Sequence, residues 1–249
     1  MTRHRFFLPP DKLQPEKMTG EVTFPEAQSH QICKVLRLRP GSLVSVSDGR
    51  GGEWQVCLTE VGSRRTIGII QSYQQKGPDT LTSLTLYQSL LKAAKFELIL
   101  QKCTELGVHR FVPVETVRCV PSELGVARTE RFRSIVREAA EQSGRVTVPV
   151  VEQWPELFKD ALRSATNEGI AIVLWEDEHM ARLRDIPLQQ NAASVSLFVG
   201  PEGGFSGEEI EVARSCGAYT VSLGSRILRA ETAAIVGSAL VLAQTGDVG

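Results

Sequence analysis

The run Ile170–Leu174 is apolar at every position, and it constrains the fold of this chain more than any other feature. A short strand of this kind buries both of its faces, as the strands of parallel sheets do. The strongly apolar runs Val195–Val199 and Tyr219–Leu223 have a similar form. From residue 84 onwards, strand-like and helix-like segments alternate, which is typical of an α/β domain with a mostly parallel sheet.

Further elements of this domain follow from apolar spacing and from Gly and Pro positions. The strands that we expect are Leu84–Leu91, Arg110–Val114 and Val146–Val151, and the helices are Lys92–Leu106, Thr129–Ser143 and Pro155–Ala165.

The amino-terminal part has a different pattern, with short strands between turn residues. We expect strands at 6–8, 21–24, 43–47, 53–58 and 66–72, and a short helix over 25–36. Closely spaced short strands are typical of a small β-barrel. The polar stretch 74–80 contains Gly77 and Pro78, so we place a domain boundary there, with domains at 1–73 and 74–249.

Composition excludes several classes of protein. The chain has 249 residues and a net charge of −1, which excludes a polycationic tail protein. Its five cysteines form no C-x-x-C pair, so we expect neither a disulfide framework nor a metal site. The start lacks an apolar signal segment, and the longest apolar run, 233–243, is too short to span a bilayer. We therefore expect a cytoplasmic protein that does not enter a membrane.

A glycine-rich loop after a buried strand is the first segment that suggests a ligand. Gly200–Gly204 follows Val199, and Ser206 and Glu209 have the spacing of a capping box, which marks the start of a helix. Ligands of parallel sheets bind beyond the carboxyl ends of the strands. The loop lacks the dinucleotide and P-loop patterns, and the Glu202 carboxylate would repel a phosphate. A ligand with hydroxyls or a positive charge suits it better, and a tight turn without a ligand is the alternative.

A second segment, Leu223–Ala234, also follows a strand and contains two arginines and a glutamate close to an apolar pair. Its backbone could recognise a flat heterocycle. The segment Ala233–Ala243 is then apolar on all sides, so we expect a helix that is buried in the core or against a second subunit.

Together these segments resemble the bacterial rRNA uridine N3-methyltransferases that act on small-subunit (16S) rRNA. The residues that carry the resemblance are Gly200–Ser206, Leu223–Ala233, Lys102–Val108 and Glu138–Arg145, with weaker matches at His4–Phe7, His30–Leu38 and Asp48–Gly49. The resemblance covers nearly the whole chain.

The resemblance implies a PUA-like small β-barrel in front of a SPOUT domain, an α/β methyltransferase fold with a deep trefoil knot. It further implies a homodimer that binds S-adenosyl-L-methionine (AdoMet) and acts on 16S rRNA or the small ribosomal subunit. The cofactor-binding residues that it implies are Leu174, Glu176, Gly200, Pro201, Glu202, Gly203, Gly204, Leu223, Gly224, Ile227 and Leu228.

The chemistry needs a base, or a cation that stabilises the uracil anion, because uridine N3 carries a proton at neutral pH. Arg229 and Glu231 are the candidates for catalysis, although an ion pair between Arg226 and Glu231 that braces the loop is an equally good interpretation. The basic residues that we expect to contact RNA are Arg3, Arg5, Lys34, Arg37, Arg39, Lys95, Lys102, Arg118 and Arg145.

We therefore expect AdoMet-dependent methylation of uracil N3 in 16S rRNA. A knotted ribose 2′-O-methyltransferase is the first alternative, and an RNA-binding module without catalysis is a weaker one.

Overall fold

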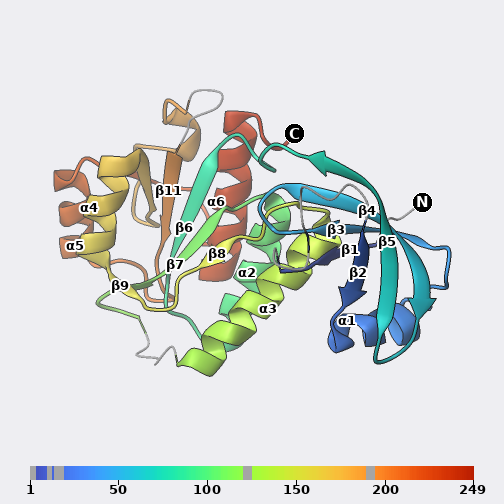
Figure 1. The fold of residues 1–249 in the computed structure, drawn as a ribbon. Coiled ribbons are helices and arrows are strands. Elements are labelled where there is room, and N and C mark those ends of the chain that lie inside the picture. Colours follow the sequence, from blue (N-terminus) through green and yellow to red (C-terminus); the bar gives the residue numbers. More distant parts are fainter. Residues whose placement is uncertain (1–3, 10–12, 14–19, 120–124, 189–193) are drawn as a thin grey trace. The chain divides into compact units, whose positions relative to one another are not determined.

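The computed structural model describes residues 4–9, 13, 20–119, 125–188 and 194–249 (Figure 1). It divides the chain into two compact units. The first unit comprises residues 1–79 and 140–148, and the second comprises residues 80–139 and 149–249. Arg3, one of the expected RNA contacts, lies outside the described residues.

The first unit contains a five-stranded sheet in the order β1-β3-β4-β5-β2. The bounds are Arg5–Phe7 for β1, Glu21–Phe24 for β2, Leu43–Ser47 for β3, Gly52–Val61 for β4 and Thr66–Gln75 for β5. Strands β1 and β3 run parallel, and the other pairs are antiparallel. Between β2 and β3, α1 (Glu26–His30) continues into the π-helical turn η2 (Gln31–Val35). Helix and strands therefore follow the pattern expected from the sequence.

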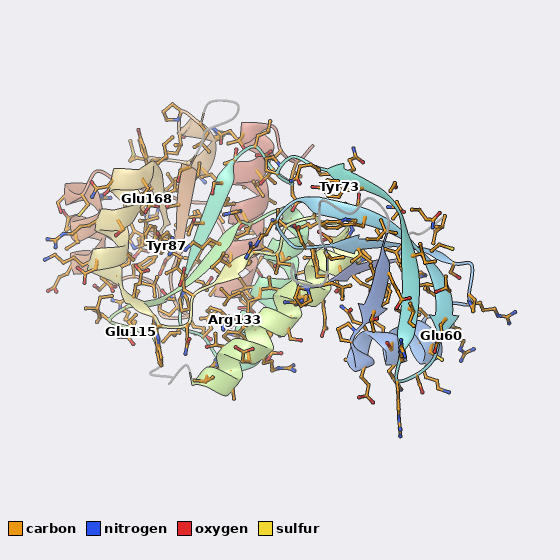
Figure 2. The ribbon with its side chains drawn as sticks, in the orientation of Figure 1. Glu60, Tyr73, Tyr87, Glu115, Arg133 and Glu168 are labelled. Atoms are coloured by element: carbon orange, nitrogen blue, oxygen red, sulfur yellow. The ribbon has the colours of Figure 1, made fainter. Side chains whose placement is uncertain are left out.

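Aromatic side chains fill the interior of this curved sheet. Trp54 is fully buried, and its ring lies 4.8 Å from that of Tyr73, the residue labelled in Figure 2. Phe6 and Phe24 come from the two edge strands and meet edge to face, with ring centroids 5.7 Å apart. The core thus bridges the two ends of the sheet, as in a small open barrel.

Asp79 attaches the segment 140–148 to the first unit. Its carboxylate accepts hydrogen bonds from the backbone N–H groups of Val146 (2.9 Å) and Thr147 (3.0 Å), and from Nε of Arg145 (3.1 Å). Burial alone raises the pKa of Asp79, but the hydrogen bonds from Thr147 and Val146 and the charge of Arg145 outweigh it and lower that pKa. The strand expected over Val146–Val151 is therefore mostly wrong, because two of its N–H groups bond to Asp79.

The second unit contains a parallel sheet in the order β12-β10-β11-β6-β7-β8, with β9 also paired to β7. The strands are β6 (Ser83–Ser89), β7 (Arg110–Glu115), β8 (Val150–Val151), β9 (Glu156–Leu157), β10 (Ile170–Leu174), β11 (Ser194–Val199) and β12 (Tyr219–Val221). The helices are α2 (Ala93–Leu106), α3 (Val126–Ser143, which belongs to this unit as far as residue 139), α4 (Phe158–Glu168), η3 (Leu183–Asp185), α5 (Gly207–Ser215) and α6 (Ala230–Thr245). The expected parallel α/β sheet is confirmed.

Helix α4 begins later than the sequence indicates. Pro155 was expected to open this helix, but Glu156 and Leu157 pair with Val114 and Glu115 of β7. The helix can start only after these residues leave the sheet, at Phe158.

Helices cover both faces of the sheet, with α4 and α5 on one face and α2 and α6 on the other (Figure 1). On the first face, Tyr87 of β6, labelled in Figure 2, stacks on Phe198 of β11 with ring centroids 4.3 Å apart. On the other, α6 approaches the sheet closely, since a Cβ at Gly237 would lie 2.9 Å from Leu174 Cδ1 and 3.1 Å from Leu197 Cδ2. The apolar helix expected near the carboxyl end thus packs in the core, although Leu240 stays 45% exposed.

In the described part of the chain, no helix is both long and apolar enough to cross a membrane. The trefoil knot that the resemblance implies stays a prediction.

Candidate functional site

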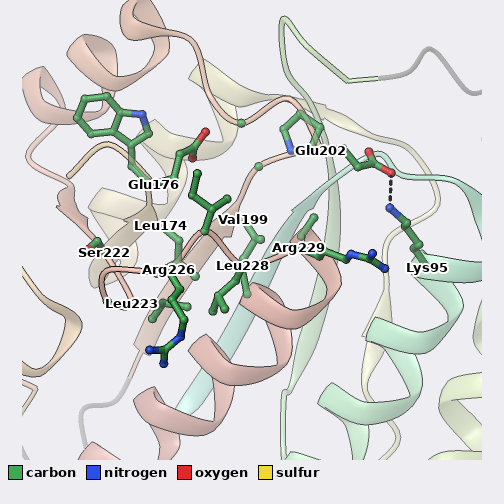
Figure 3. Close-up of a pocket in the computed structure, with 18 residues that line it drawn as sticks. Lys95, Leu174, Glu176, Val199, Glu202, Ser222, Leu223, Arg226, Leu228 and Arg229 are labelled. Carbon is green, nitrogen blue, oxygen red and sulfur yellow. Dashed lines mark hydrogen bonds and ion pairs between the residues drawn. The ribbon is translucent and has the colours of Figure 1, made fainter. Parts of the chain in front are cut away.

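The carboxyl ends of three adjacent parallel strands, β10, β11 and β12, open into one cavity of about 380 Å³ (Figure 3). Its walls are Leu174–Glu176 after β10, Val199–Gly204 after β11 (Gly203 excepted), and residues from Ser222 to Ala230 after β12. Lys95 of α2 and Ala233 of α6 complete the lining. This edge of a parallel sheet is where such proteins bind ligands.

The structure brings together nearly all of the residues expected to bind the cofactor. Leu174, Glu176, Gly200, Pro201, Glu202, Gly204, Leu223, Gly224, Ile227 and Leu228 line the cavity. Gly203 does not, because it faces Arg118 instead. Their contact with a cofactor stays a prediction.

The helix after the glycine loop starts where the sequence indicates. Ser206 Oγ accepts a hydrogen bond from the N–H of Glu209 (3.2 Å), and Glu209 Oε2 accepts one from the N–H of Ser206 (2.8 Å). This capping box fixes the first turn of α5 at Gly207 and thereby the end of the loop.

Gly204 is the conformationally demanding glycine of the loop. Its φ is +66°, a left-handed value that favours glycine. A Cβ at this position would collide with the Glu176 carboxylate, lying 2.8 Å from its Cδ. The loop therefore approaches the β10 wall as closely as the absence of a side chain allows.

Arg118 holds the outer side of the same loop. Its Nη1 donates hydrogen bonds to the carbonyl oxygens of Gly203 (2.9 Å) and Phe205 (3.4 Å). The N–H of the preceding Val117 donates to Glu209 Oε1 (2.9 Å). Arg118 was expected to contact RNA, but in this structure its guanidinium positions the glycine loop.

The loop after β10 is fixed by Glu178. Its Oε1 accepts hydrogen bonds from the N–H groups of Met180 (2.9 Å) and Ala181 (3.3 Å), and its Oε2 accepts from Arg214 Nη2 (3.1 Å). The bond from the Met180 N–H is the main reason that the pKa of Glu178 is lowered. Arg214 also lies over the ring of Trp175, 5.4 Å from its centroid. The contacts by which Arg214 holds the loop after β10 were not predicted from the sequence, because Arg214 and Glu178 lie 36 residues apart.

Lys95 is the basic residue whose observed position differs most from the one expected from the sequence. It was expected on an RNA-binding surface, yet its Nζ lies at the edge of the cavity, 3.0 Å from Glu202 Oε1 (Figure 3). The same Nζ lies 3.7 Å from Glu231 Oε2. Burial raises the pKa of Glu202, but the hydrogen bond and the charge of Lys95 lower it overall. The expected alternative, an ion pair of Glu231 with Arg226, is wrong in the described part of the chain, where Glu231 pairs with Lys95. Arg229 lines the cavity and is exposed.

Two further basic residues form ion pairs within the first unit. Arg5 forms an ion pair with Glu53 and donates from Nη1 to the carbonyl oxygen of Arg145 (2.6 Å). The side chain of Arg145 is only 6% exposed and pairs with Asp79. Both guanidinium groups are therefore turned to protein partners, which argues against the phosphate contacts expected of them.

The other expected RNA contacts lie at the surface. Lys34, Arg37 and Arg39 are exposed in the first unit. Lys102 is partly exposed on α2 of the second unit, and its Nζ lies 2.8 Å from Glu105 Oε1. An exposed lysine or arginine can neutralise a phosphate, so these four remain available to RNA.

The lining of the cavity suits a particular kind of ligand. Leu174, Leu223 and Leu228 offer an apolar surface to a flat ring. The carboxylates of Glu176 and Glu202 can bind hydroxyl groups or positive charge. A nucleoside that carries a positive charge matches this combination.

Comparison with known proteins gives matches along most of the chain. Residues 78–242 match the family model of an RNA methyltransferase domain, and residues 24–71 match that of an RNA methyltransferase PUA domain. The relative named ribosomal RNA small subunit methyltransferase E from Rickettsia conorii is 32% identical over 216 residues, with 85% of each chain covered. The protein of the same name from Synechocystis sp. is 34% identical and covers 96% of this chain and 77% of its own.

Solved structures give the same result. The ribosomal RNA small subunit methyltransferase E of Neisseria gonorrhoeae, bound to S-adenosyl methionine, is 31% identical and superposes with a TM-score of 0.85 over 96% of each chain. A methyltransferase of Legionella pneumophila in complex with the same cofactor is 29% identical, with a TM-score of 0.84 over 98% of each chain.

Proposed function

Because this chain belongs to the RNA methyltransferase family of the ribosomal RNA small subunit methyltransferases E, we propose that it transfers the methyl group of AdoMet to N3 of a uridine in 16S rRNA. The observation that carries the proposal is the cavity that the ends of β10, β11 and β12 share. The family resemblance indicates N3 of uridine as the atom that is methylated, and the cavity offers a place where AdoMet, the methyl donor, could bind.

The residues of the cavity fit AdoMet. Gly204, which has no Cβ and a left-handed backbone, leaves room for the Glu176 carboxylate beside the loop. We infer that Glu176 and Glu202 receive the hydroxyl and cationic parts of AdoMet, and that Leu223 and Leu228 enclose its adenine. AdoMet, when bound, supplies an electrophilic methyl group on a positively charged sulfur.

The remaining task of the protein is to position the uracil and to stabilise its charge as the N3 proton leaves. Arg229 lines the cavity, and Glu231 lies behind Lys95 at the start of α6. We infer that Arg229 belongs to the catalytic end of the cavity and that Glu231 supports this end through its ion pair with Lys95.

We assign the affinity for RNA to the exposed basic residues of the first unit, Lys34, Arg37 and Arg39.

We also propose that the enzyme acts in the cytoplasm. Methyl transfer from a sulfonium needs no metal ion, so the proposal includes none.

We further propose a homodimer. Leu240 of α6 is 45% exposed and Leu98 of α2 is 40% exposed, and these two helices pack against each other. A second copy that covers this apolar surface would remove it from water. Light scattering at micromolar concentration should give the mass of a dimer, and a monomer would contradict this part of the proposal.

The function is tested by incubating the protein with AdoMet and small-subunit RNA, followed by mass spectrometry of the digested nucleosides. We expect 3-methyluridine. A 2′-O-methylated nucleoside would indicate the ribose-modifying alternative, and an unmodified digest would indicate a binding module without catalysis.

A further inference from the structure

The ammonium group of Lys95 is held at the edge of the cavity by two carboxylates from different elements. We propose that Lys95 is a catalytic residue, the cation that contacts the uracil and stabilises its negative charge during methyl transfer. This inference rests on the proposed function and adds a group that the sequence placed elsewhere.

The position of Lys95 follows from the fold of the second unit. Lys95 lies in the first turn of α2, which follows β6, the neighbour of β11 in the sheet. Its Nζ reaches Glu202 in the glycine loop (3.0 Å) and Glu231 in the first turn of α6 (3.7 Å). Two anchors on separate elements fix the ammonium group before any substrate arrives, which is the condition for effective electrostatic stabilisation.

Glu231 itself is badly placed to touch a substrate. It is not part of the cavity lining, and its Oε2 is buried and accepts no hydrogen bond among the described residues. Its nearest charged partner is Lys95. Glu231 is therefore a positioning residue, which acts through the lysine that does face the cavity.

The two arginines of the cavity are less constrained than Lys95. Arg226 extends to the opposite side of the cavity, whereas Arg229 extends to the side of Lys95 (Figure 3). Both are exposed, and within the described ranges no carboxylate pairs with either of them. A long side chain that is free to move loses more conformational entropy when it meets a substrate than one that is already held.

The charges near the reacting atoms support this assignment. Glu176, Glu202 and Glu231 contribute three negative charges, and Lys95, Arg226 and Arg229 contribute three positive charges. The sulfonium of the methyl donor adds one more positive charge, so the balance that faces the uracil is one net positive charge. Ionisation of the uracil then brings the balance to zero. One N–H bond of Lys95 donates to Glu202, and the contact with Glu231 is an ion pair at 3.7 Å, so N–H bonds of the ammonium group remain for a uracil oxygen.

The step that Lys95 assists is balanced without any further reagent. The N3 proton passes to water in the open cavity, and the resulting negative charge spreads over N3 and the two carbonyl oxygens of the uracil. The N3 electron pair then forms the bond to the methyl carbon as the carbon–sulfur bond breaks, and the electron pair of that bond stays on sulfur. Anion and sulfonium become a neutral methylated base and a neutral thioether.

The decisive experiment compares Lys95→Met with wild type on two RNA substrates. The substrates are 16S rRNA transcribed with uridine or with 5-fluorouridine, free or assembled into small subunits, whichever form the wild type methylates better. Fluorine makes the N3 proton more acidic, so a fluorinated substrate depends less on a stabilising cation. We expect Lys95→Met to lower kcat on uridine RNA by about 10²-fold at neutral pH. On 5-fluorouridine RNA the loss should shrink to about tenfold or less.

The pH dependence gives a second readout. Without the cation, the reaction depends on uracil that ionises unaided, so the kcat of Lys95→Met should rise by about tenfold per pH unit up to pH 9. The wild-type kcat should level off at a lower pH. Lys95→Arg keeps the positive charge in a different geometry and should fall between the two.

Controls separate this role from a structural one. Lys159→Met removes a lysine from the exposed surface of α4, and it should leave kcat on both substrates unchanged. Thermal unfolding and calorimetric AdoMet binding of Lys95→Met show whether the cavity is intact. Should Lys95 only brace α2 against the glycine loop, its loss would reduce kcat equally on both RNAs and at every pH.

The outcomes also distinguish this inference from the proposed function. If wild type produces no 3-methyluridine, the proposed function fails and the role of Lys95 fails with it. If wild type is active and Lys95→Met shows either full activity or equal losses on both RNAs, the role of Lys95 alone is overturned.

Discussion

Replacing Gly204 by alanine tests how closely the two main walls of the cavity approach each other. The new Cβ would collide with the Glu176 carboxylate, and the backbone would have to keep a φ of +66°. A left-handed conformation costs an alanine about 1–2 kcal/mol, so the free energy of unfolding should fall by about that amount. Glu176 ends in a flexible side chain and can swing away, so the collision adds little to the loss of stability.

The cost of moving Glu176 should appear in cofactor binding instead. A hydrogen bond to a charged group contributes about 1.5–3 kcal/mol, so losing the one expected from Glu176 should raise the Kd for AdoMet by about 10–100-fold. Calorimetry gives the Kd, and urea unfolding gives the stability. Gly207→Ala is the matched control: a Cβ there meets nothing within 4 Å, so the Kd should stay at the wild-type value and the free energy of unfolding should not fall.

A double variant separates strain from collision. In a Glu176→Ala background the carboxylate is absent, so Gly204→Ala should still reduce stability but should no longer weaken AdoMet binding. Wild-type stability and wild-type affinity in Gly204→Ala would together refute the described loop geometry.

Three further variants probe other parts of the structure. Because folding lowers the pKa of Asp79, the contribution of its carboxylate to stability is complete above about pH 5 and is lost as the pH falls through the folded-state pKa. Asp79→Asn should therefore be less stable than wild type at neutral pH and should lose less stability on acidification. Unfolding followed by circular dichroism measures both effects. Arg37→Ala combined with Arg39→Ala should weaken RNA binding and lower its salt slope by about one unit per lost phosphate contact while AdoMet binding is unchanged; an unaltered slope would exclude phosphate contacts by these arginines. Arg214→Ala removes a hydrogen bond to Glu178 and the cation over Trp175, so the Kd for AdoMet should rise by about tenfold, and an unchanged Kd would show that the β10 loop needs no such support.

Local signals in the sequence predicted the elements around the cavity well. The run Ile170–Leu174 is a central parallel strand, and Ser206 and Glu209 form the expected capping box. Both depend on interactions that a few neighbouring residues decide, such as burial on two faces or a hydrogen bond three residues along the chain.

Partners that lie far apart in the sequence could not be predicted in this way. Asp79 bonds to Val146, 67 residues later, and Lys95 meets Glu202 after 107 residues. Nothing in the neighbourhood of a lysine tells which carboxylate the topology will bring to it. The general function therefore followed from motifs, while the role of Lys95 required the three-dimensional structure.

The first unit is built from two separate segments of the chain, residues 1–79 and 140–148. This has a consequence for the synthesis of the chain on the ribosome. Residues 80–139 lie between its two parts, and translating them takes about 3–12 s at ordinary rates. During that interval the nascent first unit lacks the N–H groups of Val146 and Thr147, which the Asp79 carboxylate binds in the finished protein. The amino-terminal unit, although begun first, therefore cannot be completed before residues 80–139 of the second unit have been made.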